Sequence, residues 1–142
     1  ARQDDSYITI LPYDGFKISY TLDYQHPVIG SSYFEFDAEK IDFAEEIAKA
    51  RTFGFAAEVE KLHEQGLALG GSLENAVLIE ETKTVNPLRF ENEFVRHKIL
   101  DVIGDMFLNG RIMGHIIAVK SGHRLHVKLA EKIREKMLEE EI

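Results

Sequence analysis

The sequence predicts an α/β domain of the α+β type: a two-layer sandwich in which a mostly antiparallel sheet carries helices on one face, with a small βαβ insert. Three observations support this fold class. Strand-like runs are grouped early in the chain, two long amphipathic helices are predicted in its second half, and a strand–helix–strand pattern separates them at about 51–80. The chain, 1–142, is long enough to form a single domain that buries a core without disulfide or metal staples.

The first two predicted strands are 7–11 (YITIL) and 16–22 (FKISYTL), and both are rich in β-branched and aromatic residues. Pro12, Asp14 and Gly15 lie between them, and these residue types favour turns. Two strands joined by so short a turn predict a β-hairpin.

A third strand is predicted at 31–36 (SSYFEF), after a segment that contains Pro27 and Gly30. Asp37 is suited to cap a following helix, because its carboxylate can accept a hydrogen bond from a backbone N–H of the first turn. That helix is predicted at about 39–50, where the apolar residues keep helical spacing.

The insert begins with a short extended piece at 51–55 (RTFGF), and a helix is predicted at about 56–65, ending at Gly66. A glycine pair and the strand 74–80 (ENAVLIE) follow. Strand, helix and strand in this order predict a small βαβ unit.

The second half of the chain contains two predicted helices and one strand. The first helix runs over about 91–108 and stops at Asn109 and Gly110, a good C-terminal signal. The strand is 113–120 (MGHIIAVK), and Ser121 is expected to cap the second helix. The apolar stripe of this second helix steps by four residues and comprises Leu125, Leu129, Ile133 and Met137.

Composition excludes several classes of protein. There is no cysteine, so there is neither a disulfide framework nor a thiolate zinc site, which fits a reducing compartment such as the cytoplasm. Acidic residues outnumber Lys plus Arg by 25 to 17, and a net charge of −8 argues against nucleic-acid binding. No apolar run approaches the ~20 residues of a transmembrane segment, and no signal peptide is visible. The start at Ala1, close to a strand-like pattern, is what a cut end would look like.

The helix containing VRHKILDVIGD, 95–105, has metal-ligand or acid–base side chains on one stripe. His97, Asp101 and Asp105 are spaced four residues apart, so each lies one turn beyond the last at about 100° per residue. The opposite side is apolar and comprises Val95, Ile99, Val102 and Met106. Because apolar or small residues share the His/Asp front, we expect that front to face a cleft or a second protein layer. These residues are Phe94, Gly104 and Leu108.

His97 and Asp101 are one helical turn apart and can converge on one metal ion, for which zinc or iron(II) suits the ligand types. A helix-surface pair without metal is the commoner role of such a spacing. The segment KSGH, 120–123, places His123 at a strand-to-helix junction, where α/β folds open their clefts. A helix N-terminus disfavours the imidazolium, so a charged His123 needs a carboxylate partner, for which Asp105 is a candidate. Local capping or packing is the alternative role of His123.

These motifs resemble a specific family. The segments 51–55, 66–79, 90–105 and 120–123, in this order, resemble UDP-3-O-acyl-N-acetylglucosamine deacetylase, the zinc enzyme of the committed step of lipid A synthesis in Gram-negative bacteria. The segment 23–27 (DYQHP) is also similar to the family. The resemblance covers only the second of the two domains of such an enzyme. The absent N-terminal domain would carry a Glu-His motif that supplies the third zinc ligand and the general base.

The resemblance implies a role for each residue that matches a family motif. His97 and Asp101 look like two of three zinc ligands, in a site that keeps an open position for water. His123 looks like the general acid that protonates the departing glucosamine nitrogen, and Asp105 like the carboxylate that orients it. Thr52 resembles the hydroxyl donor to the oxyanion.

The resemblance also implies contacts with the substrate. Lys98 resembles a substrate-contacting lysine, and Tyr24, with Asp23 nearby, is at a position where the family often has an aromatic residue against the uracil ring. The insert looks like the hydrophobic passage for the acyl chain, with ordinary core packing as the alternative for each lining residue. The lining residues expected are Phe53, Ala56, Val59 and Ala68.

Of the four other histidines, three are expected to be structural and one, His126, to face solvent. His126 is at a position where the family more usually shows Asn. Its spacing from His123 lets it share that face, but a solvent-facing side chain is the favoured expectation. His26, His63 and His115 lie in a probable turn, near a helix end and in a strand, and carry no comparable argument.

Two hypotheses follow from different classes of function. The first is the C-terminal half of a zinc-dependent deacetylase, inactive alone because two zinc ligands and no general base hold the ion poorly. The second is a non-catalytic module that binds a UDP-sugar or an acyl ligand. Retention of four polar site residues favours the first, because such residues carry a desolvation cost that a binding module need not bear. These are His97, Asp101, Asp105 and His123.

Overall fold

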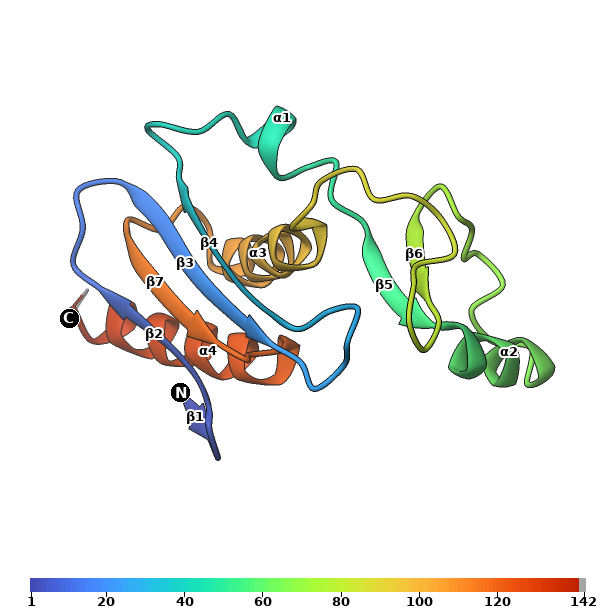
Figure 1. Ribbon diagram of the computed structural model, residues 1–142. Helices are drawn as coiled ribbons and strands as arrows, with labels where there is room; N and C mark the ends of the chain where they lie inside the picture. Colours follow the sequence, from blue (N-terminus) through green and yellow to red (C-terminus); the bar gives the residue numbers. More distant parts are fainter. Residues whose placement is uncertain (141–142) are drawn as a thin grey trace.

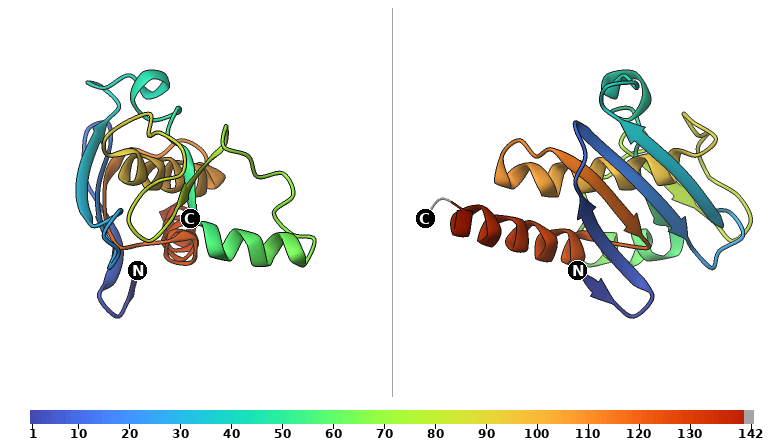
Figure 2. Two further views of the ribbon diagram at one scale, coloured as in Figure 1. Left: turned by 45° about the vertical axis from the view of Figure 1, so that its right-hand side comes forward. Right: turned by 90° about the vertical axis from the view of Figure 1, so that its left-hand side faces the viewer.

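The structure is a computed structural model that describes residues 1–140. Its main sheet has five strands in the order β1-β2-β7-β3-β4 (Figure 1). Helices α3 and α4 both cover one face of this sheet, and the left view of Figure 2 shows the two layers nearly edge-on. The predicted two-layer α+β architecture is confirmed. The elements of these layers are β1 Arg2–Gln3, β2 Ser6–Leu11, β3 Phe16–Asp23, β4 Ser31–Asp37, β7 Gly114–Val119, α3 Glu93–Met106 and α4 His123–Glu140.

The predicted hairpin of the first two strands is wrong, because β7 lies between β2 and β3. Ile116 of β7 pairs with Ile10 of β2 in antiparallel register and with Ile18 of β3 in parallel register. The connection between β2 and β3 needs to span only two strand spacings, about 10 Å, which four residues can reach. A short turn therefore does not require that the two strands it joins pair with each other. Every second residue of β7 is buried, which favours a position for β7 in the middle of the sheet.

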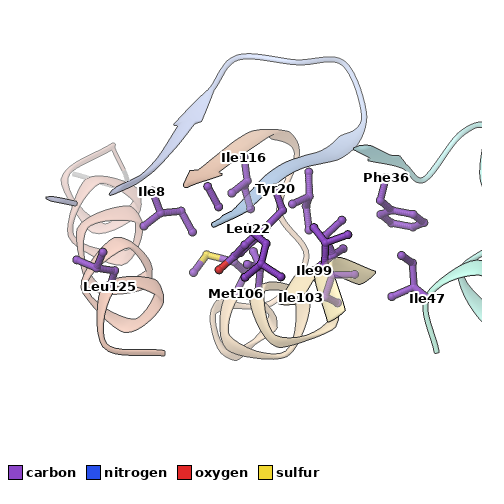
Figure 3. Close-up of a cluster of buried hydrophobic side chains, with 14 of the residues drawn as sticks. Ile8, Tyr20, Leu22, Phe36, Ile47, Ile99, Ile103, Met106, Ile116 and Leu125 are labelled. Carbon is purple, nitrogen blue, oxygen red and sulfur yellow. The ribbon is translucent and has the colours of Figure 1, made fainter. Parts of the chain in front are cut away.

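The core lies between this sheet and α3 (Figure 3). The back of α3 that the sequence predicted to be apolar is fully buried at Val95, Ile99, Val102 and Met106. Burial of each such side chain contributes about 1.5–3 kcal/mol relative to exposure. This packing fixes the rotation of α3, and with it the direction in which the opposite face points. No helix among residues 1–140 is both long and apolar enough to cross a membrane.

The helix expected at 39–50 is only one turn long, α1 Phe43–Glu46. Its N-cap is Asp42, whose Oδ1 accepts a hydrogen bond from the Glu45 N–H. Asp37 is not the cap, because its carboxylate accepts from the Tyr13 hydroxyl and from the Glu39 N–H at the end of β4. A side chain engaged by two donors in a turn is not available to start a helix.

The predicted βαβ insert is confirmed. Strands β5 (Thr52–Phe55) and β6 (Ala76–Ile79) are parallel, and α2 (Ala56–Glu64) connects them at the side of the molecule away from the main sheet (Figure 1). Gly66, with φ of +72°, follows α2 where the Leu67 N–H bonds to the Leu62 carbonyl. This is a Schellman ending, which favours glycine because of the positive φ.

The ends of two helices differ slightly from the prediction. Helix α3 stops at Met106, and a 3-10 turn, η1 Phe107–Asn109, follows it. Gly122, not Ser121, is at the N-cap of α4, and its carbonyl accepts hydrogen bonds from the backbone N–H groups of the first turn. The Ser121 hydroxyl instead lies 2.8 Å from a ring nitrogen of His126.

A buried ion pair that the sequence did not suggest joins the insert to α3. Arg51 donates from Nε to Glu93 Oε1 at 2.9 Å and from a terminal nitrogen to Glu93 Oε2 at 3.2 Å. Glu93 is fully buried, and its carboxylate also accepts the backbone N–H groups of Arg51 and Arg89. All four hydrogen bonds converge on one carboxylate at the start of α3.

We expect Glu93→Ala to lower the free energy of unfolding by about 3–5 kcal/mol, because it leaves the Arg51 guanidinium buried without its partner. Urea unfolding followed by circular dichroism measures this change. Glu58→Ala, on the exposed side of α2, is the control and should change stability by less than about 0.5 kcal/mol. Equal effects of the two substitutions would contradict the structural role of the ion pair.

Candidate functional site

His97 and Asp101 form a close pair on the front of α3. His97 Nε2 lies 3.2 Å from Asp101 Oδ1, and the two side chains are 16% and 17% exposed. His97 Nδ1 lies 3.0 Å from the Ala50 carbonyl oxygen, which only accepts hydrogen bonds, so Nδ1 carries the proton. The backbone just before β5 therefore sets the orientation of the imidazole and directs Nε2 toward the carboxylate.

The pair also shifts the pKa values of its members. Burial lowers the pKa of His97, but the hydrogen bond and charge of Asp101 outweigh it, so the net shift is upward. Burial raises the pKa of Asp101, but His97 and Lys98 outweigh it, so the net shift is downward. Without a metal, His97 and Asp101 thus stabilise each other as imidazolium and carboxylate.

The Asp105 carboxylate lies one turn further along α3 and contacts two histidines of α4. Its Oδ2 is 2.7 Å from His123 Nδ1 and 2.8 Å from His126 Nδ1. The structure thus brings Asp105 and His123 together, as the sequence suggested. The His123 side chain is 67% exposed, and its Nε2 lies 3.9 Å from Asp101 Oδ1. His123 therefore presents its second nitrogen to the same open side as the His97–Asp101 pair.

The expectation that His126 faces solvent is wrong, because its exposure is 0%. Both ring nitrogens are hydrogen-bonded, Nδ1 to Asp105 and Nε2 to the Ser121 hydroxyl. These two partners offset the desolvation cost of a buried imidazole. The i, i+3 spacing from His123 places the two rings at 5.9 Å between centroids, one on the surface and one in the interior.

Two groups of side chains have the right atoms for a metal. The first group is Asp105, His123 and His126. Each offers one atom that could bind a metal, and these three atoms lie within 4.8 Å of one another. Hydrogen bonds between the rings and the carboxylate already account for this group. The His97–Asp101 pair fits a zinc ion better, because a backbone carbonyl holds the Nδ1 proton and leaves Nε2 to converge with a carboxylate oxygen.

Three of the predicted substrate residues lie next to one another. Lys98 Nζ is 3.8 Å from Asp101 Oδ2 and 5.7 Å from the centre of the Phe53 ring. Tyr24 meets Phe53 edge to face at 6.0 Å between ring centres. Phe53 also contacts Phe94 at 5.0 Å, so ordinary packing holds it as well. An aromatic and cationic strip therefore leads from the His97–Asp101 pair toward the end of β3.

Asp23 ends β3 and accepts a hydrogen bond from the Ser31 hydroxyl. Its Oδ2 lies 3.7 Å from Lys120 Nζ, and Lys120 also contacts Asp5. Lys120 has a φ of +51°, an unusual conformation for a lysine, at the turn that leads into α4. No role for Lys120 was predicted from the sequence, although the KSGH segment that contains it also contains His123.

The four residues expected to line an acyl passage all belong to the insert, with Phe53 on β5, Ala56 and Val59 on α2, and Ala68 in the loop after α2. Ala56 lines a groove of about 360 Å³ with His26, Phe55 and Ile79 among its walls. Val59 is half-buried, whereas Ala68 is exposed in the loop after α2, with a φ of +56°. Figure 1 shows this loop running beside α2, on the outer side of the insert.

Thr52 is exposed at the start of β5, opposite Ala76 of β6. It follows Ala50, the residue whose carbonyl orients His97, by two positions, so chain connectivity places it near that pair. His26, His63 and His115 each have a hydrogen-bond partner, which for His115 lies on the neighbouring strand β3. Their partners are the Val28 N–H, the Ala68 carbonyl and the Ser19 hydroxyl.

In zinc-free solution we expect His97→Gln to cost stability most between about pH 4 and pH 6, and progressively less as pH rises further. The pairing contributes fully above the unfolded pKa of Asp101, about 3.9, and below that of His97, about 6.5, and it is lost as pH rises above the raised folded pKa of His97. Urea unfolding with a chelator at several pH values measures the difference. His63→Gln, on exposed α2, should show no such trend, and a cost of His97→Gln that grows with pH above about pH 6 would contradict the pairing.

Comparison with known proteins identifies a single family. The family profile described as UDP-3-O-acyl N-acetylglycosamine deacetylase matches residues 1–135. The curated UDP-3-O-acyl-N-acetylglucosamine deacetylase of Myxococcus xanthus is 52% identical over 132 residues, which cover 91% of this chain and 42% of the relative. The relative from Campylobacter fetus is 50% identical over 131 residues, covering 90% of this chain and 45% of its own length.

A third relative, from a Nitratiruptor species, is 46% identical over 144 residues, covering 99% of this chain and 48% of its own length. The chain thus spans less than half the length of these relatives and corresponds to their C-terminal half. The resemblance inferred from the four sequence segments is confirmed. The chain belongs to the UDP-3-O-acyl-N-acetylglucosamine deacetylase family.

Proposed function

We propose that this chain is the C-terminal half of a zinc-dependent deacetylase that hydrolyses the acetamide of UDP-3-O-acyl-N-acetylglucosamine in lipid A biosynthesis, in the cytoplasm of a Gram-negative bacterium. The observation that carries the proposal is the geometry of His97. The Ala50 carbonyl holds its Nδ1 proton, so Nε2 and Asp101 Oδ1 converge on one point beside the open nitrogen of His123.

His97 and Asp101 are the two zinc ligands that this chain provides. A zinc ion supplies Lewis-acid polarisation of an amide carbonyl and lowers the pKa of water. His123 donates a proton from Nε2 to the glucosamine nitrogen as the C–N bond breaks, which releases acetate and the free amine. Asp105 accepts the Nδ1–H of His123 and so stabilises its charged, proton-donating form.

The remaining residues act on the substrate around that bond. Thr52 donates a hydrogen bond from its hydroxyl group to the oxyanion that forms when water attacks the amide. Lys98 contacts the substrate beside the metal, and Tyr24 and Asp23 receive the uridine end. Phe53, Ala56, Val59 and Ala68 meet the acyl chain along the insert. The contacts from Lys98 through Phe53 to Tyr24 support a continuous path for these parts.

The other half of the site comes from an N-terminal domain that supplies the third zinc ligand and the general base. The share of the relatives that this chain leaves uncovered supports this proposal. Exposed apolar side chains beside the carboxyl end of α3 support it too, since such patches mark interaction surfaces. Their exposed fractions are Phe107 51%, Leu108 77%, Met113 67% and Leu138 55%.

We expect zinc to bind this chain weakly alone and tightly once the N-terminal half of a family member is added. His97→Ala should reduce the affinity for zinc by more than about 100-fold. It removes a zinc ligand itself, whereas loss of a residue that only hydrogen-bonds to a ligand costs about 10–100-fold. Isothermal titration calorimetry measures the affinity, with His63→Ala as the matched control. Absence of zinc binding with both halves present would contradict the proposal and favour a non-catalytic module that binds a UDP-sugar or an acyl ligand.

We expect no turnover of UDP-3-O-acyl-N-acetylglucosamine by the chain alone and zinc-dependent turnover with the N-terminal half added. In the combined protein, His123→Ala should lower kcat by about 10²–10⁴-fold, the usual contribution of a general acid. A discontinuous assay for released acetate measures both. Full activity from the isolated chain would contradict the proposal that an N-terminal domain supplies half of the site.

A further inference from the structure

His126 is a buried histidine for which the proposed chemistry has no use. It is 0% exposed, it extends from α4 toward α3, and both of its nitrogens have partners at 2.8 Å. One partner is the same Asp105 oxygen, Oδ2, that receives His123 Nδ1 at 2.7 Å. A buried titratable side chain that shares an acceptor atom with a surface-exposed histidine is suited to control that acceptor.

The protons in this group can be assigned from its donors and acceptors. An ionised Asp105 only accepts, so both His126 Nδ1 and His123 Nδ1 carry a proton. Full burial favours the neutral His126 ring, and in that form Nε2 accepts a hydrogen bond from the Ser121 hydroxyl. Burial, the largest influence, lowers the pKa of His126 despite the nearby carboxylate, in agreement with this neutral form.

The groups around His126 are themselves fixed. The Tyr20 hydroxyl donates to the Ser121 carbonyl, and burial raises the pKa of Tyr20 to about 12, so it remains a donor. Ser121 is thereby held in place, and its hydroxyl stays in reach of the His126 ring. The His123 side chain, in contrast, is 67% exposed, with Nδ1 2.7 Å from Asp105 Oδ2 and Nε2 3.9 Å from Asp101 Oδ1. The buried histidine is thus hydrogen-bonded at both ring nitrogens, whereas the exposed histidine bonds to the same carboxylate through Nδ1 from the surface.

We propose that His126 is a positioning residue: a neutral ring whose Nδ1–H fixes Oδ2 of Asp105, so that the carboxylate holds the Nδ1–H form of His123. The neutral ring gives Asp105 a hydrogen-bond donor without adding a positive charge. This matters because the rings of His126 and His123 are only 5.9 Å apart between centroids. The inference rests on the role proposed for His123 in the deacetylase. Its geometry concerns this chain alone and needs neither zinc nor substrate.

Long-range ¹H–¹⁵N NMR correlations of the histidine rings in the zinc-free chain test this proposal. In the unsubstituted protein, His126 should show a single neutral form with the proton on Nδ1 between about pH 5 and pH 8. His123 should carry a protonated Nδ1 over the same range. A charged His126, or a proton on its Nε2, would overturn the proposal without any substitution.

Two variants separate positioning from packing. His126→Asn offers an N–H donor to Asp105 and a carbonyl to Ser121, so it should keep the His123 Nδ1–H signal. His126→Leu fills the space without a donor, and His123 should then lose its fixed Nδ1–H form when neutral. Unchanged His123 spectra in folded His126→Leu would contradict the proposal, and so would equal loss in both variants. Neither result bears on zinc binding or turnover, so the proposed deacetylase function is tested separately.

Discussion

Helix α3 packs against the core with one face and presents the side chains of the site on the other. The geometry of the site depends on this constraint. Its back is fully buried against the sheet at Val95, Ile99, Val102 and Met106, which leaves the helix no freedom to rotate. Its first turn is held by the Arg51–Glu93 ion pair. The stripe that carries His97, Asp101 and Asp105 is therefore directed outward because the other side of the helix is buried, and these three side chains do not have to hold one another in place.

Two partners outside α3 complete the geometry. The Ala50 carbonyl, at the end of the segment between α1 and β5, selects the proton position on His97. The start of α4 brings His123 and His126 to Asp105 from the other side. Segments far apart in the chain thus meet at one helix face. The His97–Asp101 pair is charged, whereas the buried His126 ring is neutral. The small volume of the site therefore does not hold a further positive charge at His126.

The periodic spacing of apolar and polar residues predicted much of this arrangement. It could not predict which strands pair when they are far apart in the sequence. The stripe on α3, the stripe on α4 and the βαβ insert followed from residue spacing alone, because each is a local pattern. The place of β7 between β2 and β3 did not, since pairing over about a hundred residues depends on burial in the whole sheet. The contact of Asp105 with His123 was foreseen from residue chemistry. The burial of His126 was not, because its partner Ser121 was expected to be a helix cap.

We propose that the metal is bound by His97 and Asp101 and not by the group formed by Asp105, His123 and His126. A crystal structure of this chain with the N-terminal half of a family member, with anomalous diffraction at the zinc edge, would locate the ion. We expect an anomalous peak about 2.0–2.2 Å from both His97 Nε2 and an Asp101 carboxylate oxygen. A peak coordinated instead by Asp105 and the two histidines of α4 would contradict it.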